Sequence, residues 1–101
     1  MITRNAIREE LKEIRYYMSR KSAFEKVTSS VGKNIIEQRI AIYNEFVCDA
    51  PPRLYDLYIS LYLDNNSQES LAEKLGYSIE TICRLNTKLI NFFHEKFATV
   101  A

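Results

Sequence analysis

One group of four positions constrains the fold of this chain more than any other. Ala72 lies four residues before Gly76, and Ile82 and Leu85 follow that glycine by six and nine residues. Glycine adopts the positive φ that ends a helix within a tight turn, and a small residue such as Ala72 allows a second helix to cross closely. This spacing predicts a helix-turn-helix over residues 67–88.

Apolar residues on both sides of the turn support two packed helices. Before it, Leu71, Ala72 and Leu75 form one stripe at helical spacing. After it, Ser78 can cap the second helix with its hydroxyl. The positions expected to hold that helix on the first are Ile79, Ile82, Leu85 and Leu89. Any two packed helices joined by a glycine turn could carry such residues, so the pattern favours the architecture more than it favours DNA as a ligand.

Composition points to an all-α protein. Of 101 residues, 47% are hydrophobic, which is enough to bury a core, and only two glycines and two prolines are available for the turns of a sheet. The formal net charge is +1, from 14 basic and 13 acidic residues. No global field therefore attracts nucleic acid, and any DNA contact must be local.

Two amphipathic helices are expected in the N-terminal half. In residues 4–19 and 31–47, apolar side chains recur at intervals of four, three and four. These seam positions are Ile7, Leu11, Ile14 and Met18 in the first helix, and Ile36, Ile40, Tyr43 and Val47 in the second. The seams predict either an antiparallel hairpin within one chain or a dimer interface, and two heptads are too few to choose between them.

The break around Pro51 and Pro52 divides the chain into residues 1–50, the N-terminal helices, and residues 51–101, the helix-turn-helix unit with a C-terminal extension. Pro52 suits the first turn of a new helix. Further helices are predicted over residues 53–63 and 78–97. The bulky residues that end the last helix should pack against the N-terminal helices or a second subunit; they are Leu89, Ile90, Phe92, Phe93 and Phe97.

The most basic cluster lies in the polar stretch of residues 20–30, which we expect to be mostly loop. It consists of Arg20, Lys21 and Lys26. The cluster is either part of a solvated connector or a set of phosphate contacts.

Other function classes have little support. The chain has one histidine, no glycine-rich phosphate loop and no metal-ligand motif, so we expect neither an enzyme nor a bound cofactor or metal. Cys48 and Cys83 are expected to be ordinary thiols. Without a signal sequence or a membrane-length apolar run, the protein is expected in the cytoplasm, that of a bacterial host if it is phage-encoded.

The segment over residues 54–93 resembles the C-terminal part of small phage transcription regulators of the RinA and ArpU type. Those regulators are in turn similar to the promoter-reading C-terminal domain of bacterial sigma factors. The likeness rests on three short motifs: Tyr62-Leu63-Asp64, Leu71-Ala72 with Leu75-Gly76-Tyr77-Ser78, and Ile82-Cys83-Arg84-Leu85 followed by a long amphipathic tail.

The resemblance implies that the exposed side of the last helix meets DNA. The residues placed at the groove would be Ser78, Glu80, Thr81, Arg84, Thr87 and Lys88. Arg84 would form a bidentate contact to guanine and Lys88 a phosphate contact, while Ser78 and Thr81 would meet phosphates or base edges.

Charge sets a limit on this hypothesis. Residues 51–101 hold five basic and six acidic side chains, and phosphate neutralisation supplies most non-specific affinity for DNA. Dimerisation, the basic N-terminal segment or RNA polymerase would have to assist.

The leading hypothesis is a phage or mobile-element transcription regulator. The alternative is a small protein that uses the same fold to bind and modulate a regulator or polymerase, through an exposed apolar groove or seam instead of a basic face.

Overall fold

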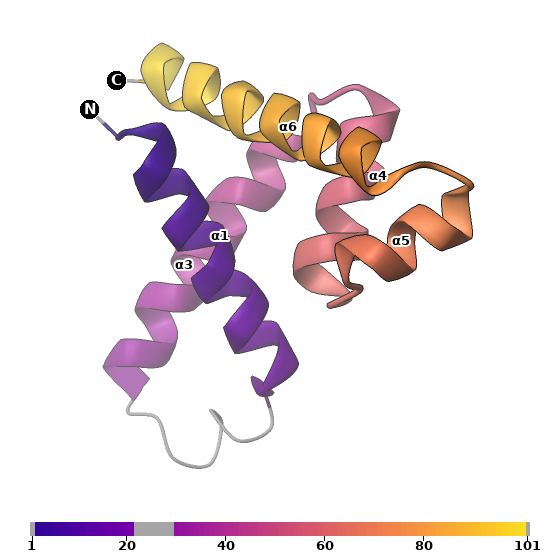
Figure 1. Cartoon of the computed structure of the whole chain (residues 1–101). Helices are drawn as coiled ribbons and strands as arrows, with labels where there is room; N and C mark the ends of the chain where they lie inside the picture. Colours follow the sequence, from indigo (N-terminus) through magenta and orange to yellow (C-terminus); the bar gives the residue numbers. More distant parts are fainter. Residues whose placement is uncertain (1, 22–29, 101) are drawn as a thin grey trace.

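In the computed structural model, described over residues 2–21 and 30–100, all regular secondary structure is helical (Figure 1). The predicted all-α fold is therefore confirmed over these residues. The elements in chain order are α1 (Arg4–Ser19), α3 (Ser30–Val47), α4 (Pro52–Tyr58), the π-helical segment η1 (Ile59–Leu63), α5 (Gln68–Leu75) and α6 (Ile79–Val100).

Local sequence signals account for where these helices begin. The Thr3 hydroxyl accepts a hydrogen bond from the Ala6 amide at 3.1 Å and so caps α1. The Ser67 hydroxyl caps α5 in the same way, through the Ser70 amide at 3.0 Å. α4 begins at Pro52, as predicted, because proline lacks the amide proton that the first helical turn leaves unbonded.

The helix predicted over residues 53–63 ends differently from an ordinary α-helix. Its last five residues form η1, which closes with a bond from the Asp64 amide to the Ile59 carbonyl at 2.8 Å. Asn65 follows with a positive φ of 59°, a conformation that asparagine tolerates better than most residues. The chain therefore turns sharply into α5 while Leu61 and Tyr62 stay buried.

The two halves of the chain contribute to a single hydrophobic core. From the first predicted seam, Ile7, Leu11 and Ile14 have 0% of their surface exposed, and Met18 is partly buried. α1 packs against η1 and α6 as well as α3. The seam of α1 is therefore covered within one chain.

The aromatic end of α6 lies against α3. The ring of Phe93 packs edge-on against Tyr43, with centroids 4.8 Å apart, and Phe97 packs in the same manner against Phe46 at 5.0 Å. Of the two partners predicted for these bulky residues, the N-terminal helices are the correct one. Figure 1 shows α6 crossing one end of both α1 and α3.

Two apolar residues beside the turn were assigned wrongly. Leu75 was expected in the apolar stripe of the first helix and Ile79 among the residues that hold the second helix on it, but 53% and 48% of their surfaces are exposed. They flank the turn itself, whereas Ala72 and Ile82, one turn further along each helix, are buried. Helical spacing alone does not distinguish a residue at the crossing from one beyond it.

Candidate nucleic-acid interface

The turn between α5 and α6 depends on one glycine. Gly76 has a φ of 72°, and the following amide, that of Tyr77, donates to the Ala72 carbonyl at 2.9 Å. A Cβ added at Gly76 would meet nothing within 4 Å. The glycine is therefore required for its left-handed backbone and not for space.

The first turn of α6 is fixed by two hydroxyls. Ser78 Oγ accepts from the Thr81 amide at 3.2 Å and lies 2.9 Å from Thr81 Oγ1. Ser78 is exposed and Thr81 is half-buried. The two residues predicted to contact phosphates or bases thus lie together at the start of the helix, and their hydroxyls are hydrogen-bonded to each other.

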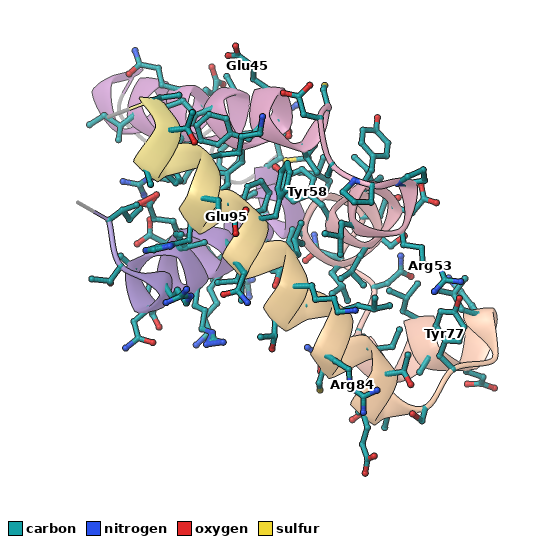
Figure 2. The ribbon with its side chains drawn as sticks, turned by 90° about the horizontal axis from the view of Figure 1, so that it is seen from above. Glu45, Arg53, Tyr58, Tyr77, Arg84 and Glu95 are labelled. Atoms are coloured by element: carbon teal, nitrogen blue, oxygen red, sulfur yellow. The ribbon has the colours of Figure 1, made fainter. Side chains whose placement is uncertain are left out.

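The remaining predicted contact residues form the outer face of α6. Glu80, Arg84, Thr87 and Lys88 are all exposed, and their spacing places them on one side of the helix. Thr87 Oγ1 donates to the Cys83 carbonyl at 3.1 Å. Within the described part of the chain, neither Arg84 nor Lys88 forms an ion pair. Arg84 points away from the helices (Figure 2).

The charges on this face cancel. Arg84 and Lys88 share it with Glu80 and with Glu95, which is also exposed and lies seven residues beyond Lys88. The outer face of α6 therefore has groups suited to hydrogen bonding in a groove but no excess positive charge of its own.

The predicted basic cluster does not lie beside α6. The guanidinium of Arg20 lies over the ring of Tyr16, 4.5 Å from its centroid. Lys21 is exposed close by, at the end of α1 that points away from α6 (Figure 1), and Lys26 is outside the described residues. Arg20 and Lys21 are thus separated from α6 by most of the length of α1, about 24 Å for 16 residues.

A different basic residue reaches the outer face of α6. Arg4, at the start of α1, donates from Nε to Asn91 Oδ1 at 2.6 Å. Asn91 lies three residues after Lys88 and seven after Arg84, so it shares their side of the helix. The residues are 87 positions apart in sequence, and only the fold brings them together.

An apolar groove lies on another side of the same two helices. It has a volume of about 140 Å³. Its apolar walls are Leu57, Leu71, Leu75, Tyr77 and Leu85, and the polar side chains of Arg53, Asp56 and Ser60 complete its lining. Leu75 and Tyr77 expose 53% and 37% of their surfaces. Figure 2 shows Tyr77 and Arg84 pointing in different directions, so a ligand of α6 and an occupant of the groove would use separate surfaces.

Burial shifts the titration of three tyrosines in the core. Burial is the main cause that raises the pKa of Tyr43, with the nearby Glu10 carboxylate adding to it. Burial also raises the pKa of Tyr58 and, against an opposing hydrogen bond with Asn86, that of Tyr62. The three hydroxyls donate to Glu10, Asn44 and Asn86 at 3.0, 2.7 and 2.5 Å.

The described residues offer little support for other kinds of site. In residues 2–21 and 30–100, no three metal-ligating side chains come together, and no helix is long and apolar enough to cross a bilayer. Cys48 and Cys83 are free thiols. No protein-family model matches the chain, and neither a curated protein nor a solved structure matches it significantly.

Proposed function

We propose that this protein is a transcription regulator, without catalytic activity, that binds double-stranded DNA through α5, the Gly76 turn and α6. The single observation that carries the proposal is the exposed face of α6, where Arg84 and Lys88 stand without an acidic partner in the described chain. The glycine turn presents that face outward, as a helix-turn-helix does with its second helix.

In this proposal the second helix of the motif enters the major groove. Arg84 donates two hydrogen bonds to O6 and N7 of one guanine, which is the commonest specific contact of arginine with DNA. Lys88, one turn further along, binds a phosphate. The start of α6, capped by Ser78, also faces a phosphate, because the unpaired amides of a helix N-terminus favour an anion.

The arrangement of the supporting helices follows from their apolar seams, and the phage setting follows from the family resemblance of residues 54–93. In a sigma-like arrangement α1 and α3 form a helical hairpin that holds α6 by its aromatic end. A phage or mobile element would be the source, and the bacterial cytoplasm the place of action. A dimer would read two half-sites about one helical turn of DNA apart.

A second function is favoured by the apolar groove. Leu75 and Tyr77 are large apolar side chains exposed beside a cavity, which suits a contact with another protein. In this alternative the chain modulates a regulator or RNA polymerase without binding DNA.

Selection of bound sequences from a random duplex library tests the leading proposal. We expect wild type to enrich one motif that contains a conserved G·C pair. Arg84→Ala should relax preference at that pair alone, with a loss of about 1 to 3 kcal/mol for the preferred sequence. The matched control is Lys96→Ala, on the same helix, because Lys96 is paired with Asp49 at 2.7 Å. Enrichment of no motif by wild type would favour the protein-binding alternative.

A further inference from the structure

α1 separates its charges between two sides. Glu10 and Glu13 both face α3, where Arg39 pairs with them; its Nε lies 3.8 Å from Glu10 Oε1, and its Nη1 contacts Glu13. Four basic residues, spaced four, four and three apart, follow another side of the helix. We name these the α1 basic stripe; its members are Arg4, Arg8, Lys12 and Arg15.

The α1 basic stripe runs between the two parts of the proposed DNA-binding unit. At one end, Arg4 donates to Asn91 on the outer face of α6 at 2.6 Å. At the other end, Arg15 Nη2 donates to the Asn66 carbonyl, in the turn before α5, at 3.3 Å. The two arginines are eleven positions apart on the helix, a distance of about 16 Å. Lys74 of α5 adds a further ammonium beside that turn, 3.0 Å from Asn66 Oδ1.

Arg4 and Arg15, at the two ends of the stripe, donate to neutral groups. Among the described residues, no carboxylate lies within ion-pair distance of Arg4, Arg8 or Arg15. Lys12 alone is paired, with Glu9 at 3.4 Å, and both side chains are largely exposed. Amide and carbonyl acceptors orient a guanidinium without cancelling its charge. The stripe therefore keeps the excess positive charge that the outer face of α6 lacks.

We infer that the α1 basic stripe binds phosphates of the same DNA duplex that α6 reads. This inference rests on the proposed function. One strand of B-DNA presents about five phosphates over the length of the stripe, and residues 51–101, with five basic and six acidic side chains, cannot supply the required charge. The stripe is bordered by Asn65, Asn66 and Asn91, whose amides suit phosphate and sugar, and by the exposed ring of Tyr16. A helix that lies on lipid would turn its apolar face outward, whereas the apolar face of α1, formed by Ile7, Leu11 and Ile14, is buried in the core.

The salt dependence of binding to a mixed-sequence duplex tests this assignment. Each phosphate contact contributes about 0.9 to the slope of log K against log salt. Arg4→Gln/Arg8→Gln should therefore reduce the slope by about 2 and weaken binding at low salt on all sequences alike. The control is Lys96→Gln, whose ammonium pairs with Asp49 on another side of α6; it should leave the slope unchanged.

Two variants that each remove one carboxylate provide a second test, in which stronger binding cannot be explained by loss of the fold. Glu9 is exposed and pairs only with Lys12 of the stripe among the described residues, so Glu9→Gln should strengthen binding several-fold by freeing that ammonium. Glu45→Gln removes one acidic charge on the side of the molecule away from Arg84 (Figure 2) and should have little effect. Circular dichroism establishes that each variant is folded.

The outcomes separate the stripe from the proposed function. If Arg4→Gln/Arg8→Gln retains the wild-type slope and Glu9→Gln binds like Glu45→Gln, while Arg84→Ala/Lys88→Ala loses binding, the stripe assignment is wrong and the proposed function stands. If folded wild type binds no duplex at low salt, both are wrong. Binding to phosphatidylglycerol vesicles that depends on Arg4 and Arg8, with no duplex binding, would also overturn both.

Discussion

The two halves of α6 behave as different kinds of helix. Residues 89–97 bury one face in the core, where Leu89 and Phe93 have 0% of their surface exposed. Residues 79–88 place only Ile82 fully inside, and Ile79 is 48% exposed. We call residues 89–97 the anchored half of α6, because they pack against the core, and residues 79–88 the presented half, because they are mostly exposed. Side chains on the presented half can be chosen for a ligand, because they contribute little to stability.

The largest effect should follow from breaking the anchored half. Phe93→Ala removes a ring that packs against Tyr43, Tyr58 and Phe92. We expect a loss of about 3 to 5 kcal/mol in the free energy of unfolding, a large share of the total for a domain of this size. Guanidinium denaturation measures it, with the half-buried Phe92→Ala as a milder control. A loss below about 1 kcal/mol would show that the anchored half is not part of the core.

Alkaline pH should weaken the same region. Burial raises the pKa of Tyr43 and Tyr58 above the value in the unfolded chain, so between those values the native state holds more protons than the unfolded state. Their contribution to stability is complete below about pH 10 and falls as pH rises, by up to about 1.4 kcal/mol per pH unit for each phenol. Unfolding free energies measured from pH 9 to 12 test this, with phenolate absorbance as a second signal. A flat profile, with these phenols ionising in the folded state, would contradict the burial.

The link between α5 and α6 should have an intermediate effect. Gly76→Ala places a Cβ at a φ of 72°, where nothing lies within 4 Å of it. The cost is then conformational alone, about 1 kcal/mol. Gly76→Asn should lose less, because asparagine tolerates the left-handed region. Equal stabilities for all three residues would show that the turn is not held in that conformation.

The smallest effect on stability is expected on the presented half and its apolar neighbours. Leu75→Ser and Ile79→Ser each change an exposed side chain. The free energy of unfolding, measured by thermal denaturation, should therefore change by no more than about 0.5 kcal/mol. The folded Leu75→Ser variant, which alters a wall of the apolar groove, then distinguishes the two functions. If α6 reads the major groove of DNA, we expect this variant to keep the DNA affinity of wild type. If it no longer binds purified RNA polymerase, the apolar groove of the protein is the functional surface.

Sequence alone predicted the parts of the fold that depend on local chemistry. The start of α4 at Pro52 and the turn at Gly76 follow from backbone constraints of single residues. The burial of Ile7, Leu11 and Ile14 follows from helical periodicity. The aromatic end of α6 was predicted to need a partner, although its partner on α3 could not be chosen until the helices were placed.

Long-range features of the candidate site were beyond sequence reasoning. The contact of Arg4 with Asn91 joins residues 87 positions apart, and nothing in either local stretch indicates it. The exposure of Leu75 depends on where α5 and α6 cross, which periodicity does not determine. The charge separation on α1 was present in the spacing of its basic residues, but its significance depends on Arg39 of α3.

Fluorescence anisotropy with a mixed-sequence duplex tests the central claim most directly. Wild type and Arg84→Ala/Lys88→Ala are compared at low and moderate salt, with the oligomer mass measured on the same samples. We predict saturable binding by wild type that weakens as salt rises and is lost in the folded double variant. Equal binding by the two proteins, or no binding by folded wild type even at low salt, would contradict the assignment of α6 as the helix that reads DNA.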